Sequence, residues 1–139
     1  MNYDAYALAI SEQVTQHIAA LDELQLKAQT RPLDFIERNS VERSLQVIVE
    51  AAIVCAKHFL KSRKKPVPAE ARAAIERVYE MLALTEPAVQ EMRGAIGMRN
   101  AIIHDYLNLD WAYIDKVLLG RKYLNVRAFV KVILKQLKS

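Results

Sequence analysis

The sequence predicts an all-α protein, an up-and-down bundle of about five helices that forms one domain over residues 1–139. The length of 139 residues is typical of a single domain. Apolar residues recur every three or four positions, which is the period of an α-helix, and no segment has the pattern of a strand. With 53% hydrophobic residues, 3 glycines and 4 prolines, the chain is neither disordered nor collagen-like nor of low complexity.

Two long helices are expected in the first half of the chain. An apolar stripe runs through residues 6–28, and the first helix therefore ends before Pro32. Asn39 is followed three residues later by Glu42, which is the spacing of a capping box, so the second helix is predicted to begin at Asn39. The apolar face of this second helix is the broadest in the chain, so it is predicted to be the most buried helix. A basic stretch before Pro66 ends it.

Shorter helices are expected in the second half. The first covers residues 69–83, and the next begins at Glu86-Pro87, with Pro87 in its first turn. The stretch after that helix, residues 107–111, is predicted to be a connection. A short helix follows over residues 111–119, and the last helix spans about residues 125–137.

Basic residues gather in two parts of the chain, although the net charge is only +4. Residues 56–75 carry a net charge of +5 and residues 116–139 a net charge of +7. Basic surface of this kind can hold a polyanion such as RNA. The candidate cluster for RNA contact is Lys61, Arg63, Lys64 and Lys65. A solvated helix end explains the same cluster equally well.

Several classes of protein are excluded by single features. The lone Cys55 rules out a disulfide scaffold, and its place on an apolar helix face predicts core packing. Glu50 interrupts the strongest apolar run, so no membrane span is expected. The N-terminal residues 1–4 lack the basic and apolar regions of a secretory signal, and a cytoplasmic protein is therefore expected.

The side chains suited to catalysis lie together between Arg99 and Tyr106. Arginine binds a phosphate with two hydrogen bonds, and histidine exchanges protons near neutral pH. Together they provide the minimum for cleaving RNA through attack of its own 2′-hydroxyl on the adjacent phosphorus. This scheme needs no metal, and the three histidines show no paired ligand spacing, so neither a metal nor another cofactor is expected.

Helical geometry separates Arg99 from His104, because five residues along an α-helix turn about 140°. Either the helix loosens before His104, or the two side chains meet across a subunit interface. A single histidine cannot be both base and acid in one step, and a twofold dimer would supply two. In the plainest alternative, both residues are surface or capping groups, with His104 favouring the helix dipole.

The segment resembles the motif of the HEPN superfamily, and specifically that of the HepT-like toxins. It reads Arg99-Asn100, three further residues and then His104-Asp105-Tyr106, which has the form R-x4-H-x-Y. Residues 42–46 resemble part of the family's second helix, and residues 92–100 resemble the approach to its motif. The resemblance covers most of the chain, from about Asp34 to Leu137, and implies a HEPN-like helical bundle.

The resemblance also implies an activity and a role for each residue. HepT-like toxins are dimeric, metal-independent endoribonucleases. A small nucleotidyltransferase antitoxin of the MntA type neutralises them by transferring AMP from ATP to the tyrosine of the motif. Carried over to this chain, Arg99 would stabilise the scissile phosphate and His104 would transfer protons. Asn100 and Asp105 would support the site, and Tyr106 would accept AMP.

Two functions from different classes are therefore expected. In the first, the chain is a ribonuclease toxin whose substrate is RNA and whose partner is a nucleotidyltransferase antitoxin, with no membrane partner. It acts as a homodimer, which can join the antitoxin in a larger hetero-oligomer. In the second, it is a non-catalytic HEPN-like subunit that binds a nucleotidyltransferase or nucleotides without cutting RNA. The presence of Arg99, His104 and Tyr106 together favours the first.

Overall fold

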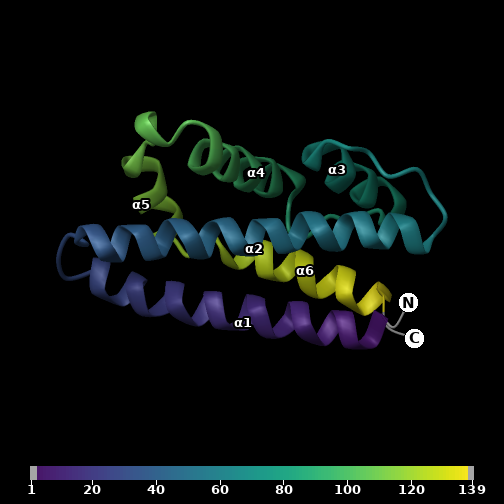
Figure 1. Cartoon of the computed structure of the whole chain (residues 1–139), viewed down its shortest axis with the longest axis horizontal. Coiled ribbons are helices and arrows are strands. Elements are labelled where there is room, and N and C mark those ends of the chain that lie inside the picture. Colours follow the sequence, from purple (N-terminus) through teal and green to yellow (C-terminus); the bar gives the residue numbers. More distant parts are fainter. Residues whose placement is uncertain (1–2, 138–139) are drawn as a thin grey trace.

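The computed structural model describes residues 3–137, and this part of the chain contains six α-helices, one short 3₁₀ helix and no strand (Figure 1). Met1 and Asn2, which entered the search for a secretory signal, lie outside the described residues. The all-α bundle is confirmed, and each of its six helices corresponds to a segment that was expected to be helical. The elements are α1 (Tyr3–Ala28), α2 (Phe35–Ser62), α3 (Ala71–Leu82), α4 (Val89–His104), η1 (Tyr106–Asn108), α5 (Trp111–Leu119) and α6 (Leu124–Leu137).

The central element is α2, which packs against α1 and α6 on one side and against α3 and α4 on the other (Figure 1). Thirteen of its 28 residues are buried, more than in any other helix, as the broad apolar face predicts. Cys55 is among them with 0% exposure, which confirms its place in the core. No helix in the described range is apolar enough over 18 residues to cross a membrane.

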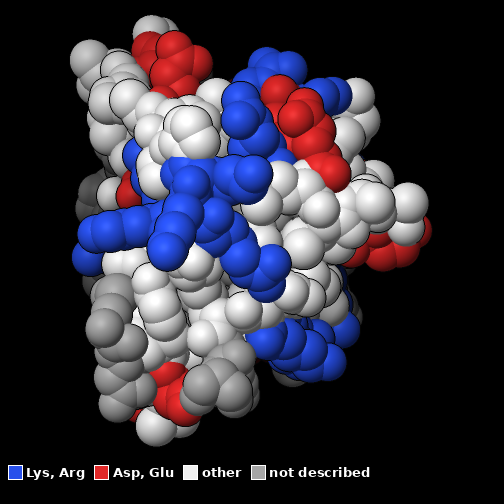
Figure 2. All heavy atoms as spheres, turned by 90° about the vertical axis from the view of Figure 1, so that its right-hand side faces the viewer, with Lys and Arg blue, Asp and Glu red and all other residues white. Residues whose placement is uncertain are grey.

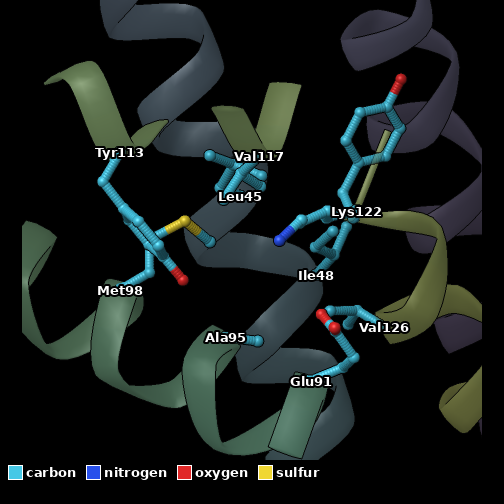
Figure 3. A pocket seen from close by; sticks show the side chains of 10 residues that line it. Leu45, Ile48, Glu91, Ala95, Met98, Tyr113, Val117, Lys122 and Val126 are labelled. Atoms are coloured by element: carbon cyan, nitrogen blue, oxygen red, sulfur yellow. The ribbon is translucent and has the colours of Figure 1, made fainter. Parts of the chain in front are cut away.

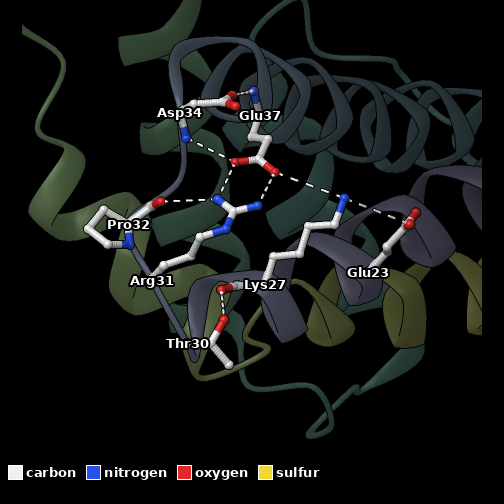
Figure 4. A network of polar contacts seen from close by, with 7 residues as sticks. All are labelled: Glu23, Lys27, Thr30, Arg31, Pro32, Asp34 and Glu37. Atoms are coloured by element: carbon white, nitrogen blue, oxygen red, sulfur yellow. Dashed lines mark hydrogen bonds and ion pairs between the residues drawn. The ribbon is translucent and has the colours of Figure 1, made fainter.

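The start of α2 differs from the prediction, because the capping box is made by Asp34 and Glu37 rather than by Asn39 and Glu42. The carboxylate of Asp34 accepts from the Glu37 amide at 2.8 Å, and the carboxylate of Glu37 accepts from the Asp34 amide at 2.9 Å. Arg31 then donates two hydrogen bonds to Glu37, at 2.7 and 2.8 Å (Figure 4). These contacts favour ionised Glu37, so they lower its pKa to about 2.

Two other predicted boundaries are corrected. Pro87 lies before α4 rather than in its first turn, because Ala88 is the N-cap and Val89 the first helical residue. The Tyr79 hydroxyl donates to the carbonyl of Pro87 at 2.7 Å and ties this turn to α3. The expected connection over residues 107–111 contains most of η1, and its last residue already begins α5.

The core contains one small cavity, of about 20 Å³, where α2, α4 and the α5–α6 region meet (Figure 3). Its walls are mainly apolar side chains, including Leu45, Ile48 and Met98. A void of this size holds about one water molecule. This cavity is too small for a nucleotide, and none of its wall residues belongs to the segment from Arg99 to Tyr106.

Candidate functional site

Arg99 lies on the side of α4 that faces α2, and its side chain is only 14% exposed. Its Nε stands 3.2 Å from Oε1 of Glu50 on α2, an ion-pair contact without hydrogen-bond geometry. Its Nη1 donates to Oδ1 of Asn100 at 2.7 Å. A guanidinium has five N–H donors, so these contacts orient Arg99 without using all of its donors.

His104 is the last residue of α4, and it is exposed. The α-helix is continuous from Val89 to His104, so it does not loosen before the histidine. Because five helical residues turn about 140°, a single chain does not bring Arg99 and His104 together. Asp105 follows as the C-cap residue, and its carboxylate accepts from Nδ2 of Asn108 at 2.9 Å, which holds the turn that carries η1.

Tyr106 begins η1, and its side chain reaches back to α2. Its hydroxyl donates to Oδ1 of Asn39 at 3.2 Å, while 48% of the residue remains exposed. Asn39, which the sequence placed at the start of α2, lies inside that helix and contacts the motif instead. The pKa of Tyr106 is raised, chiefly by hydrogen bonding to the carboxylate of Glu42 and then by the negative charge of that group.

Glu42, three residues after Asn39 on α2, is a buried carboxylate with 6% exposure. Its Oε2 accepts from Nε1 of Trp111 at 2.7 Å, and the guanidinium carbon of Arg38 lies 4.8 Å from the centre of the Trp111 ring. The sequence motif does not include Glu42, which was expected only in the capping box of the second helix. A signal was present, because Glu42 stands three residues before Leu45 on the buried stripe of α2, where an acidic side chain is rare.

A groove of about 600 Å³ extends from Arg99 between α2, α4 and the start of α3. Arg99 and Asn100 lie at its wall together with three further cations: Lys57, Arg72 and Arg93. Glu76, next to the groove, accepts from both Arg72 and Arg93, at 2.9 and 2.7 Å, and these contacts lower its pKa. With Glu50 and Glu70 as the acidic residues at its wall, the groove keeps an excess of positive charge beside Arg99.

The candidate RNA-contact residues Lys61, Arg63, Lys64 and Lys65 are all exposed at the other end of α2. Basic side chains gather across this end of the bundle in Figure 2. Arg63 is the most constrained of the four, because it donates to Gln136 at 3.0 Å and lies 4.7 Å from the centre of the Phe59 ring. Lys61 is 22 residues from Asn39 along α2, or about 33 Å. The structure thus does not bring the cluster to the motif.

Side chains that bind metal ions do not gather in this fold. Among residues 3–137, no group of three or more His, Cys, Asp and Glu side chains is placed to hold a metal ion. The candidate site therefore consists of Arg99 with Asn100, His104 at the helix end, and Tyr106 on its support of Asn39 and Glu42.

Known proteins share both sequence and fold with this chain. The mRNA nuclease HepT of Shewanella oneidensis is 32% identical over 79 residues, which is 55% of this chain and 59% of the relative. The chain thus matches less than two thirds of that relative's length.

Solved structures show the same fold at lower identity. The tri-AMPylated HEPN toxin of Shewanella oneidensis, in complex with its MNT antitoxin, superposes with a TM-score of 0.80 at 21% identity, covering 91% of this chain and 95% of that one. A toxin–antitoxin complex with AMP-PNP superposes with a TM-score of 0.76 at 21% identity, covering 91% and 96%. The family model described as ribonuclease HepT-like matches residues 8–133. Since this match covers most of the chain, the protein belongs to the HepT-like ribonuclease family.

Proposed function

We propose that this protein is the toxin of a toxin–antitoxin pair and that it cleaves RNA without a metal ion. The observation that carries the proposal is the complete R-x4-H-x-Y motif of a HepT-like chain, in which Glu50 and Asn100 orient Arg99. Arg99 binds the scissile phosphate and stabilises the charge that develops on phosphorus. His104 moves protons between the 2′-hydroxyl, the leaving 5′-oxygen and water. Asp105 holds the turn after His104 through Asn108.

The active site in this proposal is formed by two copies of the chain. Continuous helix from Arg99 to His104 supports it, because the two side chains leave one helix in directions about 140° apart. A twofold dimer also supplies the second histidine that the reaction needs, since one must accept a proton while another donates one. A strictly monomeric form with full ribonuclease activity would contradict this arrangement.

Regulation in this proposal is by AMP transfer to Tyr106 from ATP, catalysed by an MntA-like nucleotidyltransferase antitoxin. The exposure of Tyr106 and its place two residues after His104 support the assignment. An AMP group there adds bulk and negative charge where an RNA phosphate has to enter, so it repels the RNA backbone. The dimer and its antitoxin then form a larger hetero-oligomer. Because RNA and ATP are both cytoplasmic, we place the activity in the cytoplasm.

The basic cluster of Lys61, Arg63, Lys64 and Lys65 contributes RNA affinity away from the point of cleavage. Its exposed position supports this role, because phosphate contacts supply affinity without having to touch the reacting atoms. The groove beside Arg99 gives the RNA backbone a second positively charged surface.

The decisive experiment compares RNA cleavage by purified, unmodified wild type with cleavage by His104→Ala, both in excess EDTA. Cleavage by the wild type alone supports a metal-independent ribonuclease that uses His104, and we expect a loss of roughly 100-fold or more in the variant. Equal cleavage by both proteins would overturn the assignment of His104. Absence of cleavage by either, with mass spectrometry confirming unmodified Tyr106 and several RNA classes tried, would favour the non-catalytic subunit instead.

A further inference from the structure

Glu42 is the only charged side chain that is buried in the described part of the chain. Burying a carboxylate is costly unless a positive charge or several donors compensate it. No Lys or Arg within residues 3–137 forms an ion pair with Glu42, and the indole N–H of Trp111 is its hydrogen-bond donor from α5. Core packing gives no reason for an acidic side chain at this position.

Tyr106, which is 48% exposed, reaches the same side of α2 as Glu42 from solvent. Asn39, three residues before Glu42 and so on the same side of α2, accepts from the Tyr106 hydroxyl. Glu42 affects the same hydroxyl through hydrogen bonding and charge. The tyrosine hydroxyl thus has one proton and two neighbouring acceptors, the amide oxygen of Asn39 and the carboxylate of Glu42.

We propose that Glu42 is the proton acceptor for Tyr106 when the tyrosine is AMPylated. The inference rests on the proposed function, which makes Tyr106 the acceptor of AMP. The toxin chain would then contribute a catalytic group to its own neutralisation, while the nucleotidyltransferase supplies the nucleotide. Trp111 is a positioning residue in this reaction, because its N–H fixes the carboxylate of Glu42 through a 2.7 Å hydrogen bond.

The Tyr106 oxygen attacks the α-phosphorus of ATP and forms the new O–P bond. The bond from that phosphorus to the oxygen bridging it to the β-phosphate breaks, and pyrophosphate leaves. The phenolic proton passes to the Glu42 carboxylate. A carboxylate that accepts the proton of an attacking hydroxyl is also found in protein kinases, where an aspartate does so.

The test measures AMP transfer from labelled ATP to the purified chain by an MntA-like nucleotidyltransferase. Glu42→Gln is the informative variant, because its amide oxygen can still accept from Trp111 while the side chain can no longer take a proton. We expect kcat for AMP transfer to fall roughly 100-fold with an unchanged KM for the toxin chain. The exposed Glu80 of α3 provides the matched control, and Glu80→Gln should transfer AMP like the wild type.

Two further measurements separate catalysis from folding. Trp111 is the only tryptophan of the chain, so its fluorescence reports whether the site in Glu42→Gln keeps its structure. Trp111→Phe removes the hydrogen bond but keeps the carboxylate, and it should lose less activity than Glu42→Gln. Equal kcat values for wild type and Glu42→Gln would overturn the role of Glu42 while leaving the proposed function intact. A wild-type chain that takes no AMP would overturn both.

Discussion

Two glutamates on α2, five residues apart, have opposite environments. Glu37 lies in the first turn, where it accepts two hydrogen bonds from Arg31 and one from the backbone of Asp34 (Figure 4). Glu42 lies in the buried stripe, where it accepts from Trp111 and pairs with no Lys or Arg in the described range. Glu37 is thus paired with a positive charge at the surface, whereas Glu42 is buried without a positively charged partner.

The two environments indicate different roles for the two carboxylates, one in stability and one in chemistry. Folding favours ionised Glu37, as the lowering of its pKa to about 2 indicates, so its contacts stabilise the start of α2. A buried carboxylate without a counter-charge opposes folding, so a role outside stability has to account for Glu42. Glu37 should therefore be needed for stability and Glu42 for chemistry.

Tyr106→Phe should have the largest effect of any change near Glu42. Without its hydroxyl the chain has no acceptor, so AMP incorporation should be abolished, and cleavage of RNA by the variant should continue in the presence of nucleotidyltransferase and ATP. Intact-protein mass spectrometry measures the adduct. Tyr113→Phe is the control, because Tyr113 is also exposed (41%) but lies on α5 outside the motif. An AMP adduct on the Tyr106→Phe variant would contradict the assignment.

The helices could be predicted from the sequence because their apolar period is local, but the start of α2 could not. Asp34 and Glu37 have the same spacing as Asn39 and Glu42, so either pair could form a capping box. The pair that forms is the one that Arg31 can reach from the preceding turn. A contact from outside the helix decides between two locally equal signals.

The residues of the candidate site also differ in whether the sequence could predict them. Arg99, His104 and Tyr106 lie within eight residues, so the sequence motif contains them all. Glu42 is 69 residues from its partner Trp111, a separation at which spacing carries no information. The one signal for Glu42 in the sequence was that an acidic residue stands among the apolar positions of the helix face expected to be buried.

Asp34→Ala should destabilise the fold, whereas Glu42→Gln should not. Loss of an N-cap side chain costs about 1 kcal/mol, which corresponds to a melting temperature about 4 °C lower for a chain of this size. Glu42→Gln removes a buried charge and keeps its hydrogen bond to Trp111, so its melting temperature should equal or exceed that of the wild type. Thermal melts followed by circular dichroism compare the two variants. A lower melting temperature for Glu42→Gln than for Asp34→Ala would reverse the roles given to Glu37 and Glu42.

The stability that Glu37 provides should depend on pH in the acid range. The pKa of Glu37 in the folded chain is about 2, below the usual value of 4.5. Its contribution is therefore fully present above about pH 4.5 and is lost as the pH falls towards 2. Melting temperatures between pH 5 and pH 2 should fall less steeply for Glu37→Gln than for the wild type, because the variant cannot be protonated there. Parallel curves for the two proteins would mean that Arg31 gains no stabilisation from the ionised carboxylate.

The smallest effect is expected at the opposite end of α2, where charges are exposed and remote from the motif. Lys64→Ala combined with Lys65→Ala should weaken RNA binding and lower the slope of log affinity against log salt by about 1.4, the value for two contacts to single-stranded RNA. The His104→Ala background keeps the RNA intact during the titration. Lys116→Ala, an exposed lysine of α5, is the control and should leave the slope unchanged. Lys64 and Lys65 follow the end of α2, whose residue Lys61 is already about 33 Å from Asn39 along the helix. The rate of cleavage at saturating RNA should therefore not change when the two substitutions are made in the active protein. An unchanged salt slope would assign the basic cluster to a solvated helix end, while a reduced rate at saturation would place the reacting phosphate near it.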